Sequence, residues 1–244
     1  MEKILSSKIY TDVSNIYDHI MRKVRYDYWA DYIYAISNDY VGDKPNVLEL
    51  ASGNCNLARF LSAYYPKLIV TDMSLSMLNK NSKAGLKKVC CDMTMIPFST
   101  KFDLIVSTFD SVNYLITEKK LSALFNEICM VISNDGIFTF DVSLEKNSFR
   151  HIKDPLRKGS YKGVRYKQET DYDSTKNIHR NVFCITYPNG KVFKEVHIQK
   201  IFSFETYFDL MDSAGLSVKA CYDAFTFKDG SANSPRVQFI AVKK

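Results

Sequence analysis

The stretch from Asn46 to Phe60 constrains the fold more than any other part of the chain. Val47-Leu48-Glu49-Leu50 is a short apolar run typical of a buried strand, and apolar residues at helical spacing resume at Leu57. Between them, residues 51 to 56 are small or polar and predict a tight turn. A strand that leads through such a turn into a helix offers free backbone N–H groups to a ligand at the carboxyl edge of a sheet. The stretch therefore predicts an α/β protein with a nucleoside-cofactor site.

The glycine content of this turn separates two kinds of cofactor. The dinucleotide pattern G-x-G-x-x-G is matched poorly, because the small-residue positions hold Ala51, Gly53 and Cys55, so close approach of a pyrophosphate is disfavoured. The run Glu49-Leu50-Ala51-Ser52-Gly53-Asn54-Cys55 instead resembles the E/D-x-G-x-G-x-G motif of class I S-adenosylmethionine-dependent methyltransferases, whose cofactor carries no phosphate. The resemblance implies a Rossmann-like, doubly wound, seven-stranded sheet and methyl transfer that leaves S-adenosylhomocysteine as the product.

The second predicted strand ends in an acid. Asp72 follows an apolar run and lies about 20 residues beyond the turn, where a carboxylate at an exposed strand tip can accept hydrogen bonds from both ribose hydroxyls. Such an acid suits NAD as well as S-adenosylmethionine. The continuation through Leu78 is similar to the D-x-S-x-x-M-L run of these methyltransferases, in which Ser74 caps a helix and Met73 lies along the adenine.

The third and fourth predicted strands extend the resemblance. Asp92 follows Lys88 to Cys91 and matches the acid that accepts from the adenine amine, with Met93 beside it, although a turn-capping role is the alternative. Residues 101–107 form the fourth strand and run into Thr108 to Leu115, which resembles a D-S-x-N-Y-L loop beneath the transferred methyl group. There is no N-P-P-Y motif for nucleobase amines and no Pro-Cys nucleophile for cytosine.

Methyl transfer from a sulfonium depends mainly on positioning, while aromatic rings can stabilise the sulfonium and a base helps an amine or hydroxyl acceptor. The resemblance and the residue types together make Asp110, Tyr114 and His197 the catalytic candidates, although a structural role for His197 is the alternative. The residues expected to bind the cofactor are Tyr17, Trp29, Glu49, Ala51, Ser52, Gly53, Asp72, Met73, Met77, Asp92, Met93, Phe109 and Asp110.

Cys55 stands where the family usually has Gly, either for space or for a positive φ. Because Asn56-Leu57-Ala58 already indicates a helix, we expect Cys55 in its right-handed first turn. The loss of two glycines also leaves open a catalytically silent binding or regulatory protein with this fold. An NAD-dependent oxidoreductase is disfavoured by the same turn.

The 244 residues, of which 46% are apolar, predict a single methyltransferase domain over 1–244. An N-terminal helical lid is expected over 1–42 and a cofactor-binding core over 43–142. An inserted antiparallel β ribbon on the substrate side is expected over 143–202, and a last helix with a strand pair over 203–244. Period-two runs at 164–172, 178–187 and 191–201 predict the ribbon. The lid should hold two helices between Val13 and Asn38. A helix from Thr117 should end near Asn134-Asp135-Gly136, before a strand over 137–142.

Charge is concentrated in one segment of the chain. Residues 146–167 hold eight Lys or Arg residues against one acid, a net of 8 − 1 = +7, whereas the whole chain carries +6. Such a segment can attract nucleic acid, a membrane surface or an anionic substrate, or be a solvated loop. Nucleic acid is disfavoured because no stacking pattern accompanies the charges. The expected partner is a small-molecule substrate, and the sequence does not determine the oligomeric state.

Six cysteines, Cys55, Cys90, Cys91, Cys129, Cys184 and Cys221, show neither C-x-x-C nor zinc-ligand spacing, so they are expected to be reduced and mostly buried, with no metal bound. No apolar run of about 18 residues and no signal-peptide core is present. The sequence therefore predicts a cytoplasmic protein.

Overall fold

The computed structural model describes residues 4–80 and 85–244, and its centre is a seven-stranded sheet with the order β11-β12-β6-β5-β2-β3-β4. Neighbours from β6 to β4 are parallel, whereas β12 runs antiparallel to both β6 and β11. The predicted α/β sheet is confirmed. The strands are β2 (Val47–Leu50), β3 (Leu68–Asp72), β4 (Lys87–Cys90), β5 (Phe102–Ser107), β6 (Ile132–Ser143), β11 (Leu216–Asp223) and β12 (Arg236–Lys243).

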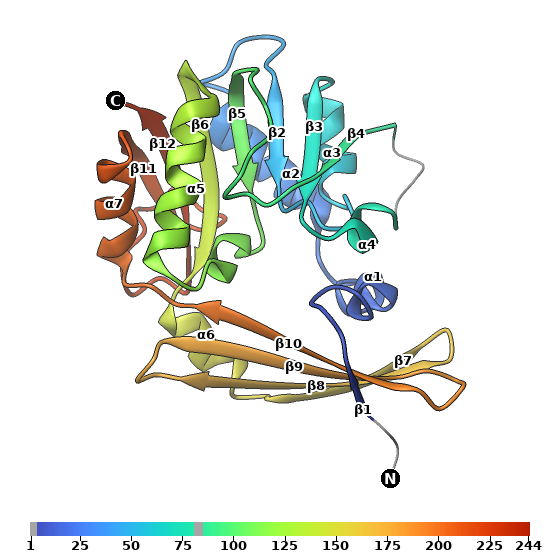
Figure 1. Cartoon of the computed structure of the whole chain (residues 1–244). Coiled ribbons are helices and arrows are strands. Elements are labelled where there is room, and N and C mark those ends of the chain that lie inside the picture. Colours follow the sequence, from blue (N-terminus) through green and yellow to red (C-terminus); the bar gives the residue numbers. More distant parts are fainter. Residues whose placement is uncertain (1–3, 81–84) are drawn as a thin grey trace.

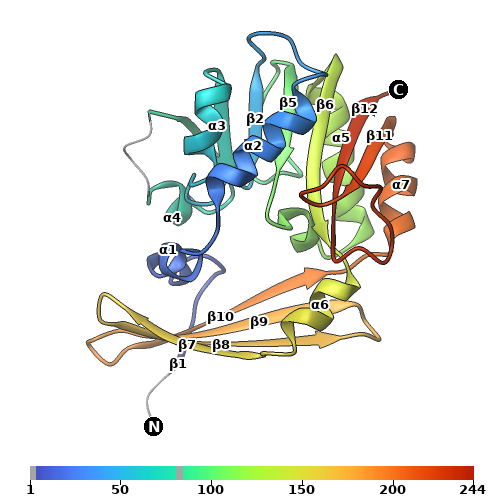
Figure 2. The same cartoon turned by 180° about the vertical axis from the view of Figure 1, so that it is seen from behind.

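Helices cover both faces of this sheet, as Figures 1 and 2 show from opposite sides. Side chains alternate between the faces along a strand, so Leu48 and Leu50 join one core cluster and Val47 joins the other. The first cluster includes residues of α5 (Glu118–Val131) and α7 (Phe204–Ser213), and the second includes residues of α2 (Tyr26–Ser37) and α3 (Ala58–Tyr64). A short helix, α4 (Leu75–Leu78), follows β3, and Ser74 caps it as predicted by accepting the Met77 N–H at 3.3 Å.

A second sheet of five strands lies across the carboxyl ends of the parallel strands (Figure 1). Three of its strands confirm the predicted ribbon, namely β8 (Val164–Asp173), β9 (Ile178–Thr186) and β10 (Val192–Lys200). The sequence did not reveal its two edge strands, β1 (Ile4–Ser6) and β7 (Leu156–Tyr161). Both are short, and β7 is mostly exposed and charged, so neither shows an apolar alternation. The helix α6 (Glu145–His151) joins β6 to this sheet.

The N-terminal segment departs from the predicted pair of helices. Of the two, α2 is a full helix and packs in the core, but the first is only the 3₁₀ turn η1 (Val13–Asn15) and the single turn α1 (Tyr17–Ile20). Val13 and Ile16 form a small third cluster with Phe183 and Ile185 of β9. This cluster ties the segment before α2 to the second sheet.

The boundary between α5 and β6 was predicted too late. The helix ends at Val131, and extended backbone begins at Ile132, which pairs with Phe102 of β5. Asn134-Asp135-Gly136 therefore lies inside a strand, where the ladder between Phe102 and Leu104 shifts register. A Cβ on Gly136 would come within 2.9 Å of the Phe102 carbonyl oxygen, so glycine permits this close approach.

The six cysteines are free, but only Cys55 is buried, so the expectation of mostly buried thiols was wrong. Cys90 is exposed, and the other four are partly exposed. Across residues 4–80 and 85–244 no helix is long and apolar enough to cross a membrane.

Candidate active site

The turn after β2 keeps a glycine-like backbone at three alternate positions. Ala51, Gly53 and Cys55 have φ of +52°, +57° and +63°. The expectation that Cys55 begins a right-handed helical turn was therefore wrong. Its N–H donates to the Ser52 carbonyl at 2.9 Å, which closes the turn before α3 begins at Ala58. All three positions thus have the positive φ that glycine adopts most readily, although two of them carry a Cβ.

This turn borders a cavity of about 300 Å³ at the carboxyl ends of β2 to β5, which we call the inner cavity. All the residues expected to bind the cofactor line it, except Trp29 and Asp110. They are Tyr17, Glu49, Ala51, Ser52, Gly53, Asp72, Met73, Met77, Asp92, Met93 and Phe109.

Asp72 is held firmly at the edge of the inner cavity. Its carboxylate accepts the Gly53 N–H at 2.8 Å and the Ser74 N–H at 2.7 Å, so it joins the cofactor turn to the start of α4. Only 9% of the residue is exposed, which corrects the expectation of an exposed strand tip. Burial raises the pKa of Asp72, although the two backbone donors act against this. Each carboxylate oxygen retains a lone pair for a ligand hydroxyl.

Glu49 is a buried acid in the wall of the inner cavity. It is 1% exposed, and its Oε2 atom has no hydrogen-bond partner among the described residues. Burial raises its pKa to about 8, and the Asp72 charge adds to the effect. A buried acid without a partner suits a cationic ligand group, such as the ammonium of an amino-acid moiety. Asp92 completes the row of acids, and its Oδ1 accepts from the N–H and hydroxyl of Thr94.

Two predicted cofactor residues lie elsewhere. Trp29 is buried in the core, where its ring packs 4.6 Å from that of Phe109, so it supports the wall of the cavity without lining it. Asp110 forms an ion pair with Arg236, which also pairs with Asp141. Its charge is matched by Arg236, and its side chain lines the outer cavity described below, so a catalytic role for Asp110 stays a prediction.

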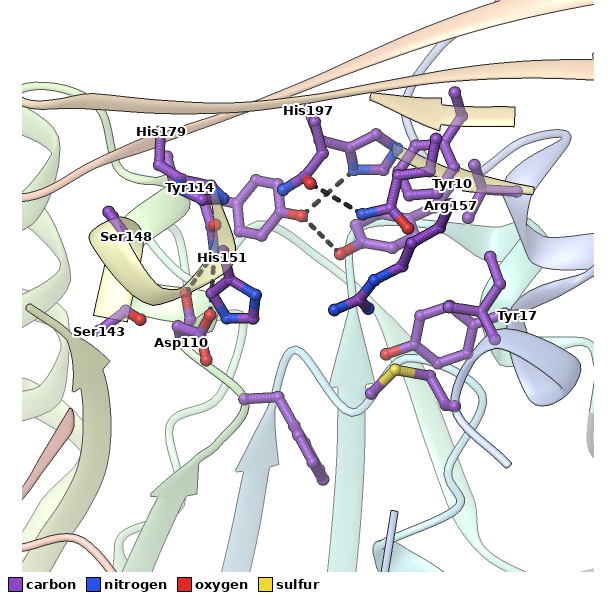
Figure 3. Close-up of a pocket in the computed structure, with 18 of the residues that line it drawn as sticks. Tyr10, Tyr17, Asp110, Tyr114, Ser143, Ser148, His151, Arg157, His179 and His197 are labelled. Carbon is purple, nitrogen blue, oxygen red and sulfur yellow. Dashed lines mark hydrogen bonds between the residues drawn. The ribbon is translucent and has the colours of Figure 1, made fainter. Parts of the chain in front are cut away.

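A second cavity of about 240 Å³, the outer cavity, lies between the two sheets (Figure 3). Its lining mixes apolar and polar side chains and includes His151 and His179, whose pKa values are lowered by burial, so both imidazoles are neutral at pH 7. Of the cations in the basic segment 146–167, only Arg157 lines it. The two cavities share four residues as a common wall, namely Tyr10, Tyr17, Phe109 and Tyr114.

The structure brings Tyr114 and His197 together at this wall. The Tyr114 hydroxyl lies 3.2 Å from His197 Nδ1, and it also lies 2.8 Å from the hydroxyl of Tyr10 (Figure 3). His197 is 2% exposed. The sequence did not single out Tyr10, which precedes the first predicted helix and belongs to no motif. Tyr10 has a positive φ of +59°, which its residue type does not predict and which only the folded structure reveals.

Comparison with known proteins agrees with this geometry. Residues 47–136 match the family model described as a methyltransferase domain. YqeM of Bacillus subtilis (strain 168), itself provisionally assigned as a methyltransferase, is 27% identical over 96% of this chain and 97% of its own length.

Two solved structures have the same fold. One is an S-adenosylmethionine-dependent methyltransferase from Clostridium acetobutylicum, with a TM-score of 0.79 and 22% identity over 96% of this chain and 98% of that one. The other is the sugar N-methyltransferase KedS8 from a Streptoalloteichus species, with a TM-score of 0.75 and 13% identity over the whole of both chains. The fold, the acid-lined inner cavity and the matched domain define a class I methyltransferase. The protein is an S-adenosylmethionine-dependent enzyme of that class.

Proposed function

We propose that this methyltransferase transfers its methyl group to a nitrogen or oxygen atom of a small molecule held in the outer cavity. The observation that carries the proposal is the wall shared by the two cavities, since it brings a cofactor site and a polar second site into contact. The acceptor atom would lie beside Tyr10 and Tyr114 at this wall.

The inner cavity has groups for each part of the cofactor. Asp72 would accept from the ribose hydroxyls, Asp92 would accept from the adenine amine, and Glu49 would pair with the ammonium. S-Adenosylmethionine, when bound, supplies an electrophilic methyl group on a sulfonium. The rings of Tyr17 and Phe109 would stabilise that cation through their π faces. Tyr114 and His197 would accept the proton that the methyl acceptor loses.

A small acceptor is supported by the size and chemistry of the outer cavity. About 240 Å³ suits a compact polar molecule, and the lining offers amide, imidazole and guanidinium groups that can fix its orientation. The likeness in fold to KedS8, which methylates a sugar nitrogen, supports a nitrogen acceptor in a polar molecule. Arg157 would favour an acceptor that also carries an anionic group. A cytoplasmic location stays a prediction of the sequence.

Calorimetry and a methylation assay together test the proposal. S-Adenosylmethionine and S-adenosylhomocysteine should both bind at micromolar concentration, and Asp72→Asn, which keeps the side-chain size, should weaken binding at least tenfold. Incubation with a panel of small amines and hydroxyl compounds should yield a product heavier by one methyl group in mass spectrometry.

Absence of binding to either cofactor form at high micromolar concentration would refute the cofactor site. Binding without transfer to any member of a broad panel would favour the catalytically silent alternative. The main motive for that alternative was the loss of two glycines, and both replacements, Ala51 and Cys55, still have a positive φ.

A further inference from the structure

We propose that Tyr10, Tyr114, His197 and Glu195 form a proton relay, which takes a proton from the ammonium or hydroxyl group of the acceptor. The inference rests on the proposed function of the two cavities. It adds Tyr10 as the catalytic residue that touches the acceptor and Glu195 as a positioning residue.

The four side chains form an unbroken line of hydrogen bonds from the cavity wall into the protein. The two tyrosine hydroxyls are 2.8 Å apart, Tyr114 lies 3.2 Å from His197 Nδ1, and His197 Nε2 lies 3.3 Å from Glu195 Oε2. The outer end lies where the cavities meet, because Tyr10 and Tyr114 line both of them. The inner end is closed, since Glu195 has no exposed surface.

The ionised carboxylate of Glu195, at the inner end, sets the direction of every hydrogen bond in the relay. An ionised carboxylate can only accept, so the proton of neutral His197 must lie on Nε2. His197 Nδ1 is then an acceptor, and the Tyr114 hydroxyl must donate to it. The Tyr114 oxygen in turn receives the Tyr10 hydroxyl, which leaves the Tyr10 oxygen free to accept a proton from the site.

Glu195 is held in its ionised form. Burial opposes its charge, but His197 and the backbone N–H groups of Val13 and Asp12 outweigh burial and lower its pKa. Val13 donates to Oε1 at 3.0 Å, and Asp12 and Ser7 donate to the same oxygen. These donors all come from the N-terminal segment that carries Tyr10. Docking of that segment on Glu195 therefore also places the outer end of the relay.

The two tyrosines pass the proton on and do not keep a charge. Burial raises the pKa of both Tyr10 and Tyr114 well above the usual value, so neither forms a stable phenolate. In the proposed step, the acceptor proton moves to the Tyr10 oxygen, the Tyr10 proton to Tyr114 and the Tyr114 proton to His197 Nδ1. The new imidazolium lies beside the Glu195 carboxylate. The acceptor lone pair forms the bond to the methyl carbon, and the electrons of the sulfur–carbon bond stay on sulfur.

Nitrogen NMR on histidine-labelled protein, bound to S-adenosylhomocysteine, tests the direction of the hydrogen bonds in the relay. No methyl acceptor is needed for this measurement. His197, assigned by loss of its signals in His197→Gln, should carry its proton on Nε2, and Tyr114→Phe should shift the Nδ1 resonance toward that of a free imine nitrogen. Tyr187→Phe is the matched control, because that hydroxyl donates to Asp12 at 2.8 Å and lies outside the relay. A neutral His197 protonated on Nδ1, or a resonance that Tyr114→Phe does not move, would overturn the proposal.

Kinetics with the best amine of the acceptor panel give the second test. Tyr10→Phe and Glu195→Gln should lower kcat by about 10²-fold, the lower range for a general base, while calorimetric affinity for S-adenosylhomocysteine stays within threefold. The deficit in kcat should shrink as pH rises toward the ammonium pKa of the methyl acceptor, because the amine then loses its proton to solvent before it binds. An equal deficit at every pH would show a merely structural role. A wild-type protein that fails to bind the cofactor would refute the proposed function instead.

Discussion

Individual residues of the cofactor turn accept backbone strain that the family usually avoids. A residue with a Cβ in the left-handed region costs about 1–2 kcal/mol, and both Ala51 and Cys55 lie there. The turn survives because Asp72 and the Ser52 carbonyl hold its backbone N–H groups. Cys55, which the sequence placed in a right-handed helical turn, has a left-handed backbone like that of Gly53.

Ala51→Gly should therefore stabilise the protein. Glycine relieves the strain and loses only a methyl group, so after the added freedom of the unfolded chain we expect a net gain of about 0.5–1 kcal/mol. Thermal unfolding should show a rise in Tm of about 1–4 °C. Ala63→Gly, at an exposed right-handed position in α3, is the control and should lower stability by about 1 kcal/mol. A fall in Tm for Ala51→Gly would contradict the assignment of strain.

Cys55→Gly should behave differently because its side chain is fully buried among core residues. Relief of strain is then offset by about 1 kcal/mol of lost apolar burial, so the change in stability should be close to zero.

Glu49 should make stability depend on pH. Its pKa is raised to about 8 in the folded protein from an ordinary 4.5, so between these values the folded state binds more protons than the unfolded state. Stability therefore falls as pH rises through this window, by up to about 3 kcal/mol between pH 5.5 and 8.5. In Glu49→Gln this loss of stability should be absent, which urea unfolding at pH 5.5 and pH 8.5 would measure.

Cofactor binding gives an independent check on Glu49. If its carboxylate pairs with a ligand ammonium, its proton is released, and calorimetry at pH 6.5 in two buffers of different ionisation enthalpy should detect about one proton lost per S-adenosylhomocysteine. No difference in proton release between wild type and Glu49→Gln would remove Glu49 from the cofactor site.

Among the elements, the N-terminal segment and the second sheet depend on each other. Strand β1 pairs in parallel with β10, and the cluster of Val13, Ile16, Phe183 and Ile185 lies between η1 and β9. The segment supplies Tyr10 and Tyr17 to the shared wall of the cavities. A site between two sheets thus depends on a short segment with little regular structure of its own.

Ile16→Ala should loosen this segment locally. Deleting a fully buried isoleucine side chain costs about 2–5 kcal/mol, and the third cluster has few other members to compensate. Hydrogen exchange should speed up around residues 10–20 and in β9, with less change in β2 and β5, and cofactor affinity should fall. Ile33→Ala, equally buried but in the main core, should instead weaken protection across the sheet. The same exchange pattern in both variants would contradict a separate segment.

At the scale of the whole molecule, the site exists only because the two sheets meet. The seven-stranded sheet supplies the acids of the inner cavity, and the second sheet supplies His197, Gln199 and Arg157 to the outer one. Ligand binding at this junction should therefore stabilise both parts together.

S-Adenosylhomocysteine at about 100 times its Kd should add about 2.7 kcal/mol, which corresponds to a rise in Tm of about 5–10 °C in a single transition. NAD at equal concentration is the control and should give less than a third of that shift, because the turn after β2 disfavours a pyrophosphate. An equal or larger shift with NAD would contradict the choice of cofactor.

The sequence by itself determined the cofactor half of the protein. Short-range patterns carry that information, since each parallel strand is a local apolar run and its terminal acid follows directly, as at Asp72 and Asp92. The cap at Ser74 and three strands of the ribbon are equally local, and all are found in the structure.

Tertiary structure alone decided the backbone of Cys55, the edge strands β1 and β7, and the early start of β6. The strands are fixed by partners far along the chain, such as Phe102 for Ile132 and β10 for β1. Cys55 differs, because its turn is closed locally on the Ser52 carbonyl and the sequence pattern did not distinguish that turn from the start of a helix. The relay is the clearest case, because Tyr10, Tyr114 and Glu195 lie on three separate segments of the chain. Their sequence separations of 104 and 81 residues leave no local pattern, and only the docking of the two sheets brings their polar atoms within hydrogen-bonding distance of one another and of His197.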